Sequence, residues 1–257
     1  MSAKGIKKVV LLPDIHYPEH DNKSLEAIKM FLIDFKPDFL VYQGDQLDMG
    51  VISHWNQDKK RQVELKRLKK DYDGFNDEVL TPFENIVGKK CKKKWITGNH
   101  EDWAKQYIDK NPQLEGIIEP EICLNLEKRG YEIIPLNGVL KLGKLSVIHG
   151  FYWNQYHSAK HAGAFNGSVV YCHTHTVQEF MKTSPVDSDD FRTATCLPCL
   201  CNLSPEYTKG RPNSWVHGFG IVYLYPNGNF NLYRVLIINN QFIFNNTIYG
   251  PNKKTRM

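Results

Sequence analysis

The first third of the chain alternates short apolar runs with polar loops. Lys7–Leu12 (KKVVLL) is β-branched and aliphatic and stops at Pro13, which predicts a buried strand that leads into a loop. Apolar residues at helical spacing predict a helix over residues 24–35, and residues 38–42 have the composition of the next strand. A strand, a helix and a second strand in this order predict a parallel β-α-β unit.

The rest of the chain carries further apolar periods. Residues 55–87 are charged and mostly free of glycine, which predicts one or two helices with breaks at Gly74 and Pro82. Similar patterns predict strands over 93–97, 131–134 and 168–172, helices over 101–110 and 114–128, and a hairpin of 139–142 with 145–148. Alternation around turn residues predicts antiparallel strands over 216–225, 230–236 and 242–248, and residues 183–190 have the composition of a surface loop.

These elements predict a mixed α/β fold in which two sheets form a sandwich flanked by helices. A chain of 257 residues fits one domain, which we expect to span residues 1–257. The hydrophobic content of 41% and the charged content of 24% are those of a globular protein. Because the apolar runs are short and the six cysteines are sparse, we expect no membrane span, no signal peptide and a reducing, cytoplasmic setting.

Positive charge is concentrated in two segments, although the net charge of +5 is too modest to indicate nucleic-acid binding by itself. The first basic run comprises Lys59, Lys60, Arg61, Lys66, Arg67, Lys69 and Lys70. The second basic run comprises Lys89, Lys90, Lys92, Lys93 and Lys94. Each run could bind a polyanion or could be a solvated surface beside acidic neighbours.

A polar cluster follows each of five predicted strands. The clusters are Asp14-Ile15-His16, Gly44-Asp45-Gln46-Leu47-Asp48, Gly98-Asn99-His100-Glu101, His149-Gly150 and His173-Thr174-His175. Strand ends gather at one edge of an α/β sheet, where ligands bind, so we expect these side chains to meet. If each segment is extended, the two side chains of Asp14-x-His16 point the same way, as do those of His173-x-His175.

The side-chain chemistry of these clusters favours a catalytic metal site. Carboxylate, imidazole and amide donors suit Mn²⁺, Fe²⁺ or Zn²⁺, and the absence of cysteine from the ligand positions argues against a structural thiolate site. One such cluster alone is often a satisfied polar turn, but five in this order rarely arise from structural needs. Cys196, Cys199 and Cys201 could bind a third metal, yet they lack a distant cysteine pair, so we interpret them as buried or surface thiols.

As a set, the clusters resemble the calcineurin-like metallophosphoesterase superfamily, whose pattern is D-x-H, G-D-x-x-D, G-N-H-[DE], H and G-H-x-H. The match runs from Asp14 to His175. The resemblance implies a four-layer αββα sandwich and two divalent metal ions, for which we expect Mn²⁺, with Fe²⁺, Zn²⁺ or Ni²⁺ as alternatives. It assigns Asp14, His16 and His175 to one ion, Asn99, His149 and His173 to the other, and Asp45 to both.

The resemblance also implies roles for three residues that do not bind metal. His100 would lie near the leaving-group oxygen, Asp48 would orient it, and Glu101 would support the site. Two adjacent cations lower the pKa of a bound water and clamp phosphate oxygens during in-line attack, while a protonated histidine can donate to the departing alkoxide. We therefore expect a phosphoric ester hydrolase that needs no nucleophilic serine or cysteine.

Three positions depart from the family pattern. Cys172 replaces the usual glycine before H-x-H, and a small residue there is compatible with both histidines. Met49 and Phe151 stand where the Ser/Thr phosphoprotein phosphatase branch carries an arginine and a glycine. These two residues argue against the activity of that branch.

More than one substrate class is compatible with the motifs, which define the reaction centre and not its rim. The basic runs, the aromatic segment 151–165 and a second polar and aromatic group favour a phosphodiesterase or nuclease acting on DNA, RNA or nucleotides, although the aromatics could instead serve packing. The second group comprises Tyr207, Lys209, Arg211, Asn213, Trp215 and His217. The alternative is a phosphomonoesterase for small molecules or phosphoproteins. A non-enzymatic scaffold is a third class, but every ligand position is filled.

Overall fold

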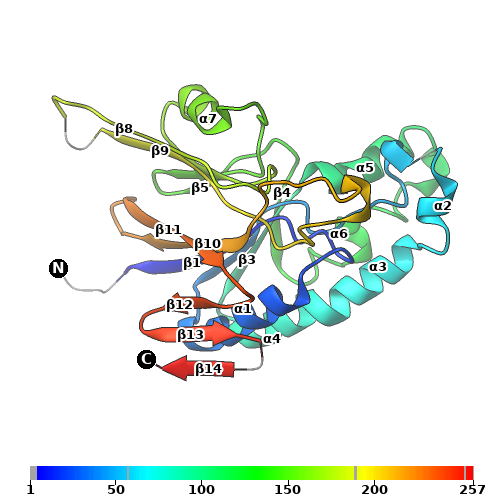
Figure 1. Ribbon diagram of the computed structural model, residues 1–257, viewed down its shortest axis with the longest axis horizontal. Helices are drawn as coiled ribbons and strands as arrows, with labels where there is room; N and C mark the ends of the chain where they lie inside the picture. Colours follow the sequence, from blue (N-terminus) through cyan, green and yellow to red (C-terminus); the bar gives the residue numbers. More distant parts are fainter. Residues whose placement is uncertain (1–4, 57, 188–189, 252, 257) are drawn as a thin grey trace.

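The computed structural model describes residues 5–56, 58–187, 190–251 and 253–256 (Figure 1). Within these residues, the larger sheet has six strands in the order β11-β10-β1-β2-β3-β4. Their bounds, in that order, are Phe230–Ile237, His217–Leu224, Lys7–Leu12, Phe39–Tyr42, Lys92–Ile96 and Tyr131–Ile134. Strands β1 to β4 are parallel, and β10 joins β1 in antiparallel orientation. The predicted parallel β-α-β unit is confirmed.

The smaller sheet, over the same described part of the chain, has five strands in the order β5-β6-β7-β9-β8. Their bounds are Leu140–Leu142, Leu145–Val147, Ser168–Tyr171, Phe191–Cys196 and Glu179–Thr183. β6, β7 and β9 are parallel, with antiparallel strands at both edges. A C-terminal antiparallel sheet of β12 (Phe242–Phe244), β13 (Thr247–Gly250) and β14 (Lys253–Arg256) packs beside the first helix (Figure 1).

Helices cover the outer faces of both sheets. The outer face of the larger sheet carries α1 (Asn22–Phe35), α3 (Leu68–Phe75), the π-helical η2 (Asn76–Leu80), α4 (Thr81–Val87) and α5 (Asn99–Ile108). The smaller sheet is covered by α7 (His157–Phe165). Short helical turns are η1 (His54–Asn56), α2 (Lys60–Val63), η3 (Pro112–Leu114), α6 (Pro120–Cys123) and η4 (Glu206–Thr208).

Three apolar clusters separate the layers. Val10 and Leu12 of β1 pack with Phe31 of α1, whereas the alternate residues Val9 and Leu11 face the smaller sheet. Each such buried side chain contributes about 1.5–3 kcal/mol of hydrophobic stabilisation. A third cluster joins the smaller sheet to α7 through residues such as Val169 and Ala162. Apolar layers on both faces of both sheets give the four-layer αββα sandwich, as predicted.

Several of the helices predicted from the sequence differ from those in the structure. The helix expected over 114–128 is replaced by turns around η3 and α6, because Gly116 and Asn125 adopt positive φ and interrupt it. The expected breaks at Gly74 and Pro82 do not occur, since helical backbone runs from Leu68 to Val87. A side chain at Gly74 would collide with the hydroxyl of Tyr17, so this glycine permits close packing.

Other differences concern the C-terminal half. The strand expected over 242–248 is a hairpin of β12 and β13, because Asn245 and Asn246 both have positive φ and turn the chain. α7, β8 and β9 were not predicted. Every residue of β8 is exposed, so no burial pattern marks it in the sequence. The loop expected over 183–190 joins β8 to β9, and residues 188–189 lie outside the described part.

Candidate metal centre

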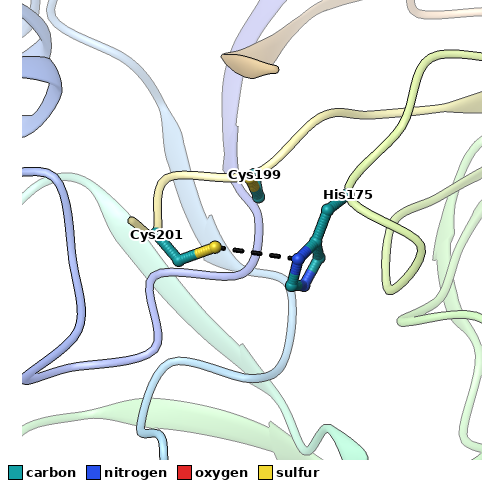
Figure 2. Close-up of side chains that lie close together, drawn as sticks. All are labelled: His175, Cys199 and Cys201. Carbon is teal, nitrogen blue, oxygen red and sulfur yellow. Dashed lines mark hydrogen bonds between the residues drawn. The ribbon is translucent and has the colours of Figure 1, made fainter. Parts of the chain in front are cut away.

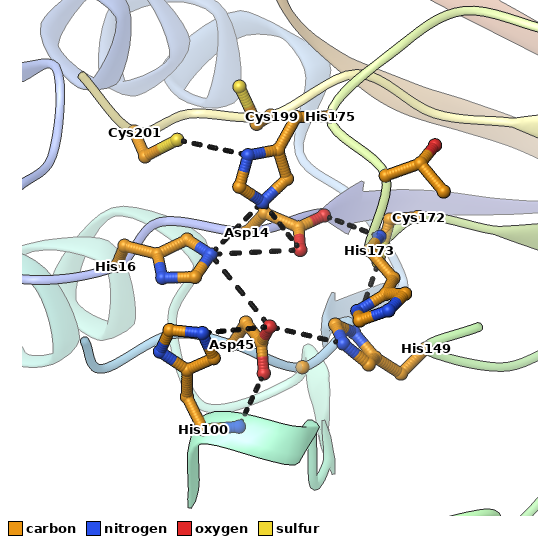
Figure 3. A network of polar contacts seen from close by, with 12 residues as sticks. Asp14, His16, Asp45, His100, His149, Cys172, His173, His175, Cys199 and Cys201 are labelled. Carbon is orange, nitrogen blue, oxygen red and sulfur yellow. Dashed lines mark hydrogen bonds and ion pairs between the residues drawn. The ribbon is translucent and has the colours of Figure 1, made fainter. Parts of the chain in front are cut away.

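The loops that follow β1, β2, β3, β6 and β7 converge at one edge of the sandwich (Figure 3). They bring together the predicted metal ligands Asp14, His16, Asp45, Asn99, His149, His173 and His175. The expectation that strand ends place these residues at one site is therefore met by the geometry. Asp14, His16, Asp45, His149 and His175 are buried, whereas Asn99 and His173 are half-buried.

The backbone of the centre is left-handed at non-glycine residues. The φ angles of Asp14, His16 and Asp45 are 39°, 53° and 51°, and those of His173 and His175 are 77° and 59°. The sequence interpretation, in which alternate residues of extended segments point the same way, is wrong, because these residues lie in turns beyond the strand ends. Such backbone costs of order 1–3 kcal/mol per residue and is concentrated at functional sites.

One donor group consists of Asp14, His16 and His175. The Nε2 atoms of the two histidines lie 3.1 Å apart, and Nε2 of His175 lies 3.5 Å from Oδ1 of Asp14. Nε2 of His16 lies 3.9 Å from the same oxygen. Three ligand atoms therefore face a common point, as Figure 3 shows.

The second donor group consists of Asn99, His149 and His173. Nε2 of His149 lies 3.0 Å from Oδ1 of Asn99, and the ring centroids of His149 and His173 are 5.0 Å apart. Asp45 lies between the two groups, since its Oδ2 is 3.2 Å from Nε2 of His149 and 3.8 Å from Nε2 of His16. One carboxylate can thus reach ligands of both groups.

The polar atoms of this centre fit divalent cations. Among the described residues, Oδ1 of Asp14 and Nδ1 of His173 are buried and make no hydrogen bond. Unpaired buried polar atoms are costly, so their presence here calls for a ligand. Oxygen and imidazole donors of this kind suit Mn²⁺, Fe²⁺ or Zn²⁺.

Burial and neighbouring charges shift the pKa values of the histidines and of Asp45 in the centre. Burial lowers the pKa of His173 to about 4, which keeps its imidazole neutral and able to bind metal. Burial alone would lower the pKa of His149 as well, but Asp45 raises it to about 9. Burial would raise the pKa of Asp45, yet His149 and His100 hold it well below its usual range. A cation bound beside Asp45 would displace the proton of His149.

His100 lies at the edge of this centre. Its Nδ1 is 2.7 Å from the backbone carbonyl oxygen of Asp48, and its Nε2 is 3.9 Å from Oδ2 of Asp45. The carboxylate of Asp48 is farther away, with Oδ1 3.9 Å from Nδ1 of His100 and 3.8 Å from Nδ1 of His16. The carbonyl group, and not the side chain, therefore makes the short contact that orients His100.

Glu101 holds the loops together. Its buried carboxylate accepts hydrogen bonds from the backbone N–H groups of Gly98, Asp45, Gln46 and Leu47, at 2.8, 3.0, 2.6 and 3.1 Å. Burial, and then the charge of Asp45, raise the pKa of Glu101 to about 7. A Cβ atom at Gly98 would collide with the carboxylate of Asp45, so only glycine allows this close approach. Glu101 thus connects the loops that carry the predicted metal ligands Asp45 and Asn99.

Cysteine thiols lie close to two of the predicted metal-binding histidines, His149 and His175. Sγ of Cys201 lies 3.7 Å from Nδ1 of His175, with Cys199 beside it (Figure 2). Sγ of Cys172 lies 3.4 Å from Nδ1 of His149. Cys196, Cys199 and Cys201 are free and buried, and the ligand atoms of Cys199, Cys201 and His175 lie within 4.8 Å of one another. The histidine contacts of Cys172 and Cys201 were not predicted, because no sequence pattern brings residues 23 to 26 positions apart into contact.

The basic runs lie in different places. The second basic run precedes and begins β3, so roughly 13 Å of strand separates Lys92 from Ile96 and the centre beyond it. Within that run Lys93 pairs with Glu84 and Lys94 with Glu132. Lys59 and Lys66 of the first basic run instead line a cavity beside His100.

The aromatic segment 151–165 contains both packed and exposed side chains, since Trp153 and Tyr156 are exposed whereas its two histidines are buried. His161 is buried and stacks on Tyr171, with its Nε2 accepting from the N–H of Phe151 at 3.0 Å. His157 is buried and its Nδ1 lies 2.6 Å from the hydroxyl oxygen of Tyr171. Neither histidine faces the metal centre.

Among the described residues, no helix is both long and apolar enough to span a bilayer.

Comparison with known proteins agrees with this geometry. The sequence profile of the calcineurin-like phosphoesterases matches residues 7–191, and the chain belongs to this family. The gene 54 protein of Mycobacterium phage L5 is 22% identical over 231 residues, 84% of this chain and 88% of that protein. The gene 54 protein of Mycobacterium phage D29 is 24% identical over the same shares. Family membership supports metal-dependent hydrolysis of phosphate esters.

Solved structures of Vps29 also align with the chain. Vps29 from Cryptosporidium parvum is 12% identical, with 98% of this chain and 99% of that one covered and a TM-score of 0.47. A single mutant of Vps29 from Entamoeba histolytica is 9% identical, with 97% and 99% covered and a TM-score of 0.44.

Proposed function

We propose that this protein is a dinuclear metal-dependent phosphodiesterase that acts on nucleic acid or nucleotides, with Mn²⁺ as its working ion. The observation that carries the proposal is the position of Asp45 between two groups of donors. Its Oδ2 lies 3.2 Å from His149 and 3.8 Å from His16. A carboxylate shared in this way offsets the repulsion between two closely spaced cations.

In this proposal each donor group holds one ion. Asp14, His16 and His175 would hold the first ion, Asn99, His149 and His173 would hold the second, and Asp45 would contact both. The chemistry that such a pair supplies is an activated water at neutral pH and charge neutralisation of the phosphate oxygens. In the aromatic segment 151–165, Trp153 and Tyr156 are exposed whereas His157 and His161 are buried, so only part of this segment is available to a substrate.

His100 acts on the leaving group in this proposal. The carbonyl oxygen of Asp48 accepts from Nδ1–H of His100, which leaves Nε2 to face the centre. When that nitrogen is protonated, it can donate to the departing oxygen of the ester. His100 also lies within reach of Asp45 and His16 as a possible ligand, so its role needs a test that separates metal content from rate.

The alternative is a phosphomonoesterase, because the donor groups are equally suited to both ester types. The test offers the purified protein, loaded with Mn²⁺, four substrates side by side: bis-p-nitrophenyl phosphate, p-nitrophenyl phosphate, single-stranded DNA and duplex DNA. Faster turnover of the diesters supports a phosphodiesterase. Turnover of p-nitrophenyl phosphate alone would replace it with a phosphomonoesterase, and no turnover of any ester would contradict both.

A further inference from the structure

A cavity of about 490 Å³ opens beside His100. Four separate parts of the chain form it. They are the loop after β1, residues 48–66, the start of α5, and η4, whose gold ribbon lies next to α5 in Figure 1. Asn99 and His100 belong both to its lining and to the metal centre. Its volume falls in the range of small-molecule sites, about 300–1,000 Å³.

Three large aromatic side chains line this cavity. Trp55 and Tyr207 are 66% and 58% exposed, so the fold leaves two large rings in water. Trp103 lies against His100, with ring centroids 3.9 Å apart. His54 lies against Trp55 at 4.4 Å and approaches Trp103 at 6.0 Å. Exposed aromatic faces next to a reaction centre are platforms on which a planar ring can stack.

The charges in the cavity are mixed. Glu19, Asp48 and Glu206 face it together with Lys59 and Lys66, and Lys66 already pairs with Glu19 at 3.4 Å. There is no excess of positive charge to attract an extended polyanion such as a DNA duplex. The lining is better suited to a planar, uncharged group that also carries hydroxyl or amino donors for the carboxylates.

We propose that this cavity binds a nucleoside, and that the nucleoside is the alcohol released from the phosphate. The inference rests on the proposed function, because it uses His100 as the donor to the leaving oxygen. Water adds to phosphorus, the bond between phosphorus and the nucleoside oxygen breaks, and the proton of His100 moves to that oxygen. The attacking water supplies the proton that restores His100. The group that leaves must therefore lie where His100 meets the cavity.

A second exposed tryptophan provides a matched control. Trp153 is 76% exposed and its ring lies 6.1 Å from that of His173, which belongs to the other donor group. It borders a different hollow, lined also by Thr174 and Gln178. Trp55 and Trp153 are thus two exposed indoles near the same centre, and only Trp55 borders the cavity beside His100.

The test measures the binding of adenosine and thymidine to the Mn²⁺-loaded protein by equilibrium dialysis. Nucleosides carry no phosphate, so binding is measured independently of catalysis. Trp55→Ala should weaken binding by roughly 5- to 150-fold, the effect of removing one aromatic stacking partner of a base. Trp55→Phe should recover most of the affinity, and Trp153→Ala should bind like the wild type. For a dinucleoside monophosphate, Trp55→Ala should raise KM by a similar factor with little change in kcat.

The outcomes of these measurements decide whether the cavity binds a nucleoside. The inference would be overturned if the wild type bound no nucleoside at millimolar concentration. It would also be overturned if Trp55→Ala bound nucleosides as tightly as the wild type, or if Trp55→Ala and Trp153→Ala lost the same amount of nucleoside affinity. Failure of the proposed function looks different, since the wild type would then hydrolyse no ester whatever its nucleoside affinity. Hydrolysis of nucleoside monophosphates alone would favour the phosphomonoesterase and still agree with a nucleoside leaving group.

Discussion

Nδ1 of His100 lies 2.7 Å from the backbone carbonyl oxygen of Asp48, whereas the carboxylate of Asp48 is 3.9 Å away. A backbone carbonyl can accept only from a ring N–H, so this contact fixes the tautomer of a neutral His100 with its proton on Nδ1. The contact survives any substitution of the Asp48 side chain. Substitutions of His100 and of the Asp48 side chain should therefore have different effects on the rate.

His100→Ala should retain both metal ions and lose roughly 10²- to 10⁴-fold in rate, the range for a lost general acid. The loss should be larger for an alkyl or sugar leaving group than for p-nitrophenolate, which departs with little help from a proton. Asp48→Asn should lose much less, because the carbonyl contact remains. Metal content by mass spectrometry and kcat on both ester types check this. If His100→Ala empties a metal site, or slows both leaving groups equally, the residue is a ligand or a positioning group.

Glu101→Gln should destabilise the protein by about 3 kcal/mol or more, because one oxygen that accepts two backbone N–H groups becomes an amide nitrogen. Each carboxylate oxygen accepts two such bonds, so either orientation of the amide leaves two donors facing an NH₂ group. Urea unfolding measures the loss. Metal affinity should fall as well, since the loops of Asp45 and Asn99 lose their common anchor.

Glu119→Gln is the matched control for Glu101→Gln. Glu119 also accepts two backbone N–H groups, from Gly116 at 2.9 Å and Ile118 at 3.1 Å, but it connects no metal-binding loops. It should reduce stability without changing metal affinity. Equal losses of metal affinity in both variants would show that Glu101 has no specific part in the centre.

Stability should also decrease in acid because of His161. Burial lowers the pKa of His161 to about 4, and its Nε2 accepts from the N–H of Phe151. A group whose pKa is lower in the folded state stabilises the fold above its unfolded pKa, near 6.5, and that contribution is lost as the pH falls towards 4. The slope should reach at most about 1.4 kcal/mol per pH unit.

The difference in unfolding free energy between the wild type and His161→Gln isolates this effect, because the metal ligands titrate alike in both. The difference should be constant above pH 7 and should shrink between about pH 6.5 and 4. A difference that does not vary with pH would show that the pKa of His161 is the same in the folded and the unfolded protein, which would contradict its lowering by burial.

Strand ends and their polar residues could be predicted because they depend on local patterns. β1 and β2 contain apolar runs and β3 ends in Trp95 and Ile96. Asp14, Asp45 and Asn99 follow these strands, and the parallel sheet brings the strand ends together. The left-handed turns could not be predicted, since no local rule places aspartate or histidine at positive φ in preference to an extended conformation. Tertiary contacts such as those of Glu101 stabilise these turns.

The cavity beside His100 could not be predicted for a related reason. Trp55 and Tyr207 are about 150 positions apart in the sequence and meet only in the folded chain. Trp103 did carry a signal, because residues three apart on a helix share a face and Trp103 follows His100 by three. The second basic run illustrates the opposite error, since charge density along the sequence says nothing about distance from the centre.

The central claim is that two metal ions, shared by Asp45, carry out the hydrolysis. The most direct test adds Mn²⁺ stepwise to protein that has been chelated and verified to be metal-free, while hydrolysis of bis-p-nitrophenyl phosphate is followed. The account predicts no activity without metal, a rise that ends at two Mn²⁺ per chain, and a larger loss for Asp45→Asn than for Asn99→Ala or His16→Ala, each of which removes a ligand of one ion. Full activity in the metal-free protein, or an Asp45→Asn variant as active as the wild type, would contradict it.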